Sequence, residues 1–95
     1  MGTSIHKVHL TISGRVQGVG FRQFVFMMAH ELRLTGWVKN KPEGAVEVFG
    51  EGSKESVDLL IGACQKGPTM ARVSVVDKTI SHGNREYNDF SIVYT

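Results

Sequence analysis

The sequence has little cysteine, little proline and no long apolar run. Its 95 residues include one cysteine and two prolines. With Cys64 alone, no disulfide can form within the chain, and this usage fits a reducing compartment. No segment approaches the roughly 20 consecutive apolar residues that span a bilayer, and residues 1–7 lack the apolar run of a secretory signal. These absences predict a cytoplasmic protein with no membrane partner.

Charge of neither sign dominates the chain. There are 11 basic and 9 acidic residues, which gives a formal net charge of +2. This mild excess helps to attract a small anion, but it is far from the dense basic patches of nucleic-acid-binding proteins. The length predicts one domain over residues 1–95, in which we expect residues 1–4 to be flexible and nothing to require more than a monomer.

Hydrophobic periodicity divides the first half of the chain into strands and a helix. Apolar and polar residues alternate over residues 5–13, as in a strand with one buried face. After the glycine-rich residues 14–20, a helical stripe begins at Phe21, and Met27 is expected to widen it. Gly36 is expected to end the helical region. Residues 37–41 and 45–50 then predict a hairpin around the turn at residues 42–44.

The second half contains another helix and two more strands. Ser53 is a candidate N-cap, and apolar residues recur at helical spacing until Gly67 and Pro68 stop the helix. Residues 72–80 are rich in β-branched residues and predict a strand with Val73 and Val75 on one face. Residues 81–89 are polar and predict a loop, and residues 90–94 alternate again. The order βαββαβ plus a terminal strand predicts an α+β domain, a two-layer ferredoxin-like sandwich with both helices on one face of a mainly antiparallel sheet.

Residues 14–22, Gly-Arg-Val-Gln-Gly-Val-Gly-Phe-Arg, join the first strand to the first helix. Glycines permit a turn whose backbone N–H groups converge, and the helix that follows points its positive end at the same place. We therefore interpret this stretch as an anion cradle in which Arg22 clamps phosphate or carboxylate. An ordinary glycine-rich turn with a surface arginine would share these features. The Walker and dinucleotide-binding glycine patterns are both incomplete here.

A second stretch, after the first helix, adds to the interpretation of residues 14–22. It reads Gly-Trp-Val-Lys-Asn-Lys-Pro-Glu-Gly-Ala-Val-Glu over residues 36–47. Together, the two stretches resemble the signatures of the acylphosphatase family, Gly-x-Val-Gln-Gly-Val-x-Phe-Arg followed by Gly-aromatic-x-basic-Asn and a later Gly-x-Val. The resemblance covers nearly the whole chain. It implies a five-stranded sheet with the short C-terminal strand at an edge.

The resemblance also implies a hydrolase that cleaves the carboxyl–phosphate bond of acyl phosphates without a cofactor or metal. Arg22 would hold the phosphate and Asn40 would orient the attacking water. Asn40 suits that position because an amide both accepts and donates hydrogen bonds. The backbone of the loop would bind the phosphate oxygens through residues Val16, Gln17, Gly18, Val19, Gly20 and Phe21.

Two other classes of function fit the same fold. A non-catalytic phosphate- or anion-binding module would keep the loop and Arg22 but has no need of Asn40. An RNA-binding sheet would carry stacking aromatics on its central strands, whereas residues 5–13 have none and residues 45–50 offer only Phe49. We therefore expect no nucleic-acid partner. A segment of a larger maturation enzyme with an acylphosphatase-like domain is a third possibility, for which 95 residues leave little room.

Other chemically active residues have ordinary explanations. Arg15 is expected to be solvated at the edge of the loop, and Cys64 to be a buried small hydrophobe. His6, His9, His30 and His82 do not have the spacing of a metal site, and His82 is expected in the polar loop.

Overall fold

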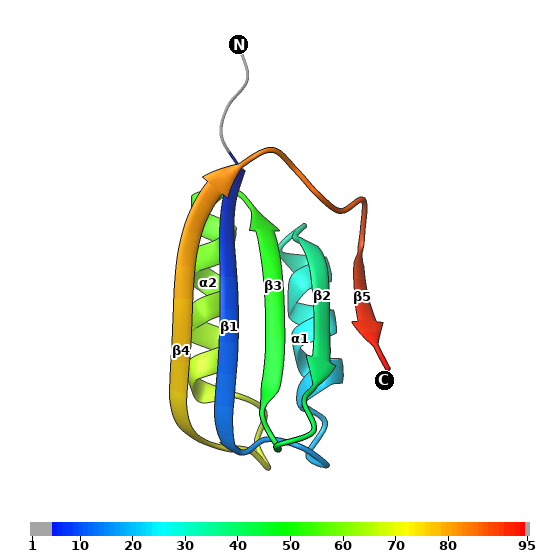
Figure 1. The fold of residues 1–95 in the computed structure, drawn as a ribbon, viewed down its shortest axis with the longest axis vertical. Helices are drawn as coiled ribbons and strands as arrows, with labels where there is room; N and C mark the ends of the chain where they lie inside the picture. Colours follow the sequence, from blue (N-terminus) through cyan, green and yellow to red (C-terminus); the bar gives the residue numbers. More distant parts are fainter. Residues whose placement is uncertain (1–4, 95) are drawn as a thin grey trace.

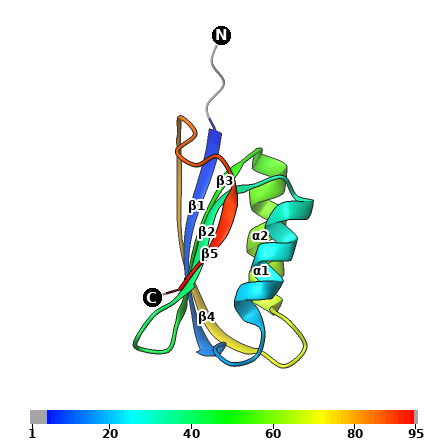
Figure 2. The same cartoon turned by 90° about the vertical axis from the view of Figure 1, so that its right-hand side faces the viewer.

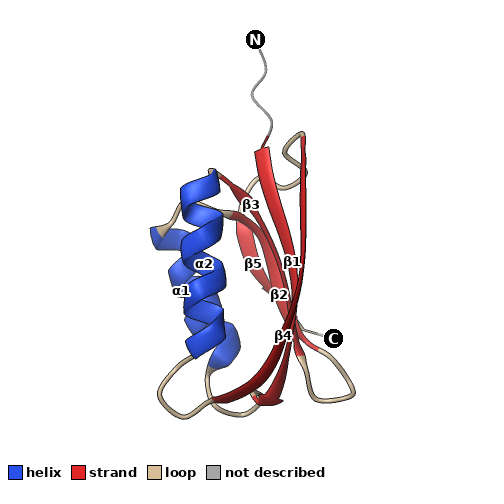
Figure 3. Ribbon diagram, turned by 90° about the vertical axis from the view of Figure 1, so that its left-hand side faces the viewer, coloured by secondary structure: helices blue, strands red, loops and turns tan. Residues whose placement is uncertain are grey.

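The computed structural model describes residues 5–94, so the expectation for residues 1–4 lies outside the described residues. Two helices cover one face of a five-stranded sheet, and the other face is open (Figures 2 and 3). In chain order the elements are β1 (Ile5–Arg15), α1 (Phe21–Glu31), β2 (Thr35–Asn40), β3 (Val46–Gly52), α2 (Lys54–Lys66), β4 (Arg72–Gly83) and β5 (Phe90–Val93). Within residues 5–94, no helix is long and apolar enough to cross a membrane.

The strands lie in the order β4-β1-β3-β2-β5, and every neighbouring pair is antiparallel except β2 and β5 (Figure 1). This arrangement confirms the predicted two-layer ferredoxin-like fold with a short C-terminal strand at an edge. Because β2 and β5 are parallel, their C-terminal ends lie at the same end of the sheet, and α1 begins at that end (Figure 1). The topology therefore brings three separate parts of the sequence together there.

The core lies between the sheet and the helices. Val8, Leu10 and Ile12 of β1 are fully buried on the helix-facing side, as their alternation predicts. The four apolar residues of the α2 stripe are also buried, and Ser53 caps α2 by accepting a hydrogen bond from the Ser56 N–H. Met27 is instead 55% exposed, so its assignment to the core stripe of α1 was wrong. It lies about 200° around the helix from the buried Val25, on the solvent side.

β1 is longer than its alternation predicted. Gly14 and Arg15 continue the strand and pair with β4, after a register shift between Ser13 and Gly14. The shift breaks the simple alternation on β4. Val73 and Val76 pack against the core, whereas Val75 is 52% exposed, which corrects the expectation that Val73 and Val75 share a face.

β4 also continues to Gly83, so the predicted loop at 81–89 shrinks to residues 84–89 and His82 lies on a strand. An edge strand whose side chains face solvent carries no apolar period, which is why the pattern missed it. Gly36 lies inside β2 and does not end the helical region. Its φ is +139°, and a Cβ there would be 2.0 Å from the Phe49 carbonyl oxygen, so only glycine permits this approach of β2 to β3.

The buried carboxylate of Glu51 on β3 holds residues 84–89 against the open face of the sheet through hydrogen bonds. Its oxygens accept hydrogen bonds from the backbone N–H groups of Glu86 and Tyr87, at 2.8–3.1 Å, and from the Thr35 hydroxyl, at 2.8 Å. Lys7 forms an ion pair with Glu86 beside this cluster. The cluster fixes the segment that leads into β5, and hence the position of β5 at the sheet edge.

The hydrogen bonds to Glu51 predict an acid-sensitive contribution to stability. Burial raises the pKa of this carboxyl, but the N–H groups of Glu86 and Tyr87, the Thr35 hydroxyl and the charge of Lys7 together lower it below its usual value of 4.5. A carboxyl whose pKa is depressed by folding stabilises the folded state above its unfolded pKa, and the stabilisation is lost as the pH falls through the folded pKa.

We expect Glu51→Gln to lower the free energy of unfolding by about 1.5–3 kcal/mol at pH 7, because its amide cannot accept all of these hydrogen bonds. The difference in free energy of unfolding between this variant and the unsubstituted protein should become smaller below pH 4.5. Urea denaturation of both proteins at pH 7 and at pH 3 measures this difference. Glu31→Gln, at an exposed position, is the matched control. A gap that stays constant with pH would contradict the linkage.

Candidate active site

The candidate site lies at the end of the sheet where β2 and β5 end and α1 begins (Figure 1). The connection from β1 to α1 is residues 16–20, and both of its flanks are buried, since Val16 and Phe21 are each 1% exposed. Gly18 and Gly20 have φ values of +74° and +80°, in the left-handed region. A Cβ at either glycine would meet nothing within 4 Å, so backbone conformation rather than space requires glycine at both positions.

The N-terminus of α1 is open. Gly20 is the N-cap in a left-handed conformation with no side-chain cap, and the first turn contains no acidic residue. The first N–H groups of a helix have no intrahelical acceptor, and they carry the positive end of the helix dipole. Successive N–H groups next to a left-handed residue form an anion-binding concavity. The start of α1 therefore has the open N–H groups that the predicted cradle requires.

Gln17 joins this loop to the hairpin that carries Asn40. Its side-chain Nε2 donates to the carbonyl oxygens of Lys41, at 2.8 Å, and Ala45, at 2.9 Å. These two carbonyls lie on either side of the β2–β3 turn, and the Lys41 N–H donates to the Ala45 carbonyl across it. One amide group thus fixes the position of the cradle relative to the end of β2.

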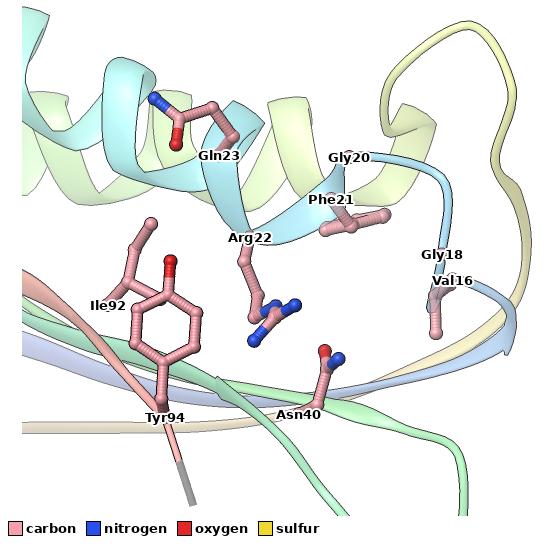
Figure 4. A pocket seen from close by; sticks show the side chains of 9 residues that line it. All are labelled: Val16, Gly18, Gly20, Phe21, Arg22, Gln23, Asn40, Ile92 and Tyr94. Atoms are coloured by element: carbon pink, nitrogen blue, oxygen red, sulfur yellow. The ribbon is translucent and has the colours of Figure 1, made fainter.

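A cavity of about 140 Å³ opens between the loop, the first turn of α1 and the ends of β2 and β5 (Figure 4). Its lining residues are Val16, Gly18, Gly20, Phe21, Arg22, Gln23, Asn40, Ile92 and Tyr94. Arg22 is the one cation among these nine residues, and none of them carries a carboxylate. The lining therefore favours an anion.

Arg22 and Asn40 reach this cavity from opposite layers of the molecule. Arg22 lies in the first turn of α1, half-buried, and its Cζ is 5.0 Å from the centre of the Tyr94 ring. Asn40 is the last residue of β2, on the helix-facing side like the buried Val38 two residues before it. Figure 4 shows the guanidinium and the carboxamide pointing into the same space. Lys39 points to the open face, where it pairs with Glu47.

The structure brings most of the sequence-predicted residues together, but not all of them. Six line the cavity: Val16, Gly18, Gly20, Phe21, Arg22 and Asn40. The side chains of Gln17 and Val19 are used elsewhere, since Gln17 binds the β2–β3 turn and Val19 packs against the core. Sequence reasoning missed Gln23, Ile92 and Tyr94. The alternation of residues 90–94 places Ile92 and Tyr94 on one face, but not beside Arg22.

The remaining candidates lie outside the cavity. Arg15 is exposed at the end of β1. Cys64 is fully buried on α2, and burial raises the pKa of its thiol to about 12. His9 pairs with Glu47 on the open face, and the His6 and His82 rings meet at 4.4 Å between β1 and β4. Residues 5–94 contain no group of three or more His, Cys, Asp or Glu side chains placed to hold a metal ion.

Comparison with known proteins identifies the family of the chain. The family model described as Acylphosphatase matches residues 8–92. The acylphosphatase of Methylococcus capsulatus is 44% identical over 87 residues, which cover 92% of this chain and 95% of that protein. The crystal structure of acylphosphatase from Bacillus subtilis superposes with a TM-score of 0.90 at 38% identity, covering 94% of this chain and 99% of that one.

The same fold is also found within a longer protein. The crystal structure of T. kodakarensis HypF superposes with a TM-score of 0.81 at 32% identity, but the match covers 95% of this chain and 12% of that one. The two acylphosphatases are instead matched over nearly their whole length. Since the family model covers most of the chain and these relatives agree along it, the protein belongs to the acylphosphatase family.

Proposed function

We propose that the protein hydrolyses acyl phosphates to a carboxylate and inorganic phosphate, with Arg22 binding the phosphate and Asn40 orienting the attacking water. The observation that carries the proposal is the shared cavity. An uncapped helix N-terminus, one arginine and one asparagine meet there, and no lining residue carries a carboxylate. A negatively charged base beside a phosphate would repel it, so a neutral amide is better suited to hold the water.

The residue set suits a reaction that needs no general acid. The leaving group of an acyl phosphate is a carboxylate, whose conjugate acid has a pKa of about 4, so it departs without a proton. The phosphoryl group carries its charge on oxygens that the N–H groups of residues 16–21 and the Arg22 guanidinium can bind in the transition state. The lining residues include no carboxylate or imidazole that could act as a base, and in this proposal a phosphate oxygen takes the proton of the water.

We also propose that the protein acts as a monomer, in the cytoplasm, without a cofactor or a metal. Arg22, Asn40 and the N-terminus of α1 supply the groups that the proposed reaction uses. A nucleic-acid partner is not part of the proposal. β1 carries no Phe, Tyr or Trp, and the open face next to it holds the carboxylate of Glu47. Light scattering on the purified protein tests the monomer.

The first experiment is the hydrolysis of benzoyl phosphate by the purified protein in the presence of a metal chelator, with a phosphate monoester as a parallel substrate. We expect cleavage of the acyl phosphate and little or none of the monoester, whose leaving group needs a proton. Cleavage that disappears with chelator would contradict the metal-free mechanism. Binding of inorganic phosphate without cleavage of any acyl phosphate would make the protein a non-catalytic anion-binding module.

A further inference from the structure

Gln17 belongs to the loop beside the cavity, but its side chain points elsewhere. Its neighbours Val16 and Gly18 both line the cavity, whereas the Gln17 side chain binds the β2–β3 turn. The Lys41 carbonyl that accepts one of its hydrogen bonds belongs to the residue directly after Asn40. The contact therefore lies one residue away from the site on both the loop and the hairpin.

The two hydrogen bonds of Gln17 are the direct polar link between the loop and the turn. They measure 2.8 Å to the Lys41 carbonyl oxygen and 2.9 Å to the Ala45 carbonyl oxygen, and a primary amide has one N–H for each. Within residues 5–94, no other hydrogen bond joins residues 16–20 to residues 41–45. Because two bonds restrain the turn, the amide fixes both the distance and the orientation of the end of β2 relative to the loop.

The two carbonyls do not depend on Gln17 for a hydrogen bond. The Lys41 carbonyl also accepts from the Gly44 N–H, at 3.1 Å, and the Ala45 carbonyl accepts from the Lys41 N–H, at 2.8 Å. Removal of a hydrogen bond is costly when it leaves a buried polar group without a partner, and neither carbonyl is left in that state when the amide is removed. The contribution of Gln17 to stability is therefore small, although its effect on the position of the turn is direct.

We propose that Gln17 is a positioning residue that acts through Asn40: it holds the end of β2 at the separation from the loop at which the Asn40 amide orients the attacking water. The inference rests on the proposed function. A phosphate bound by Arg22 and the loop N–H groups stays in place when the turn shifts, whereas the water moves with Asn40. Gln17 therefore affects turnover far more than it affects phosphate binding.

The test replaces Gln17 by methionine, which has a similar length but no N–H donor. We expect kcat for benzoyl phosphate to fall by about tenfold, less than in Asn40→Ala, because the Asn40 amide is displaced and not removed. The inhibition constant of inorganic phosphate and the midpoint of thermal unfolding should stay close to those of the unsubstituted protein. Gln65→Met, at an exposed position on α2, is the matched control and should retain full activity.

A double-mutant cycle shows whether Gln17 acts through Asn40. If it does, kcat of Gln17→Met/Asn40→Ala stays close to that of Asn40→Ala alone, because the water is already unplaced. Losses of kcat that multiply in the double variant would overturn the inference. So would an unchanged kcat in Gln17→Met, a phosphate inhibition constant that rises as kcat falls, or a large drop in the unfolding midpoint. Failure of the proposed function appears differently, as an unsubstituted protein that cleaves no acyl phosphate or an Asn40→Ala variant that turns over normally.

Discussion

Replacement of Arg22 by alanine is expected to lower kcat/KM for an acyl phosphate by about 10²- to 10³-fold, the usual loss when one charge-stabilising donor is removed from a site. Arg22 is the one cation among the residues that line the cavity, and its guanidinium lies beside the open end of α1. Removing it leaves the backbone N–H groups alone to bind the phosphate. We therefore expect inhibition by inorganic phosphate to weaken in parallel with the loss of activity.

The same substitution should leave the fold intact, which distinguishes a functional from a structural residue. A cation in the first turn of a helix opposes the helix dipole, typically by about 0.3–1 kcal/mol, so removing it relieves that cost. The contact with the Tyr94 ring is lost in return, and such contacts at exposed sites are worth about 0.5–1 kcal/mol. The two effects nearly cancel, and thermal unfolding should change little.

Two further variants make the test of Arg22 specific. Arg22→Lys keeps the charge but loses the planar fork that binds two oxygens, so it should recover only part of the affinity for phosphate. Arg15→Ala removes an exposed arginine outside the cavity and should retain nearly all activity. If Arg22→Ala binds inorganic phosphate as tightly as the unsubstituted protein does, Arg22 is not the phosphate-binding residue.

Local chemistry made the loop, the helix and Arg22 predictable from the sequence. Glycines in the loop and an apolar stripe at helical spacing from Phe21 predict a turn followed by a helix. The structure has left-handed φ values at Gly18 and Gly20 and a helix that begins at Phe21. The function of Asn40 could not be predicted in this way, because an asparagine at the end of a strand does not by itself indicate a catalytic residue. The resemblance to a family supplied that expectation, and the structure then placed Asn40 and Arg22 at one cavity.

The rest of the site depends on contacts between distant parts of the chain. The Gln17 side chain donates hydrogen bonds to carbonyl oxygens 24 and 28 residues further along the chain, and no sequence pattern predicts contacts at that separation. Tyr94 meets Arg22 only because β5 pairs in parallel with β2 at the sheet edge. The segment that leads into β5 is bound in turn by Glu51, which accepts hydrogen bonds from the N–H groups of Glu86 and Tyr87. Periodicity assigns the face of a side chain, but not its neighbour across the sheet.

Asn40→Ala should separate turnover from binding, in contrast to Arg22→Ala. Asn40 lies at the end of β2, held next to the cradle through the hydrogen bonds of Gln17 to the β2–β3 turn. If its amide holds the attacking water, its loss leaves the phosphate bound and the water unplaced. Misplacement of a reacting group by about 1 Å can cost 10²-fold, so we expect kcat to fall by at least about that factor.

The measurements that decide the function of Asn40 are kcat, KM and the inhibition constant of inorganic phosphate. We expect kcat to fall while the inhibition constant stays close to that of the unsubstituted protein, because Arg22 and the loop N–H groups remain. Asn40→Asp keeps the shape but adds a negative charge at the cavity, so it should also weaken phosphate binding by like-charge repulsion. Asn88→Ala, at an exposed position in residues 84–89, is the control. A variant of Asn40 that binds phosphate weakly yet turns over normally at saturation would show that Asn40 binds the phosphate and does not orient the water.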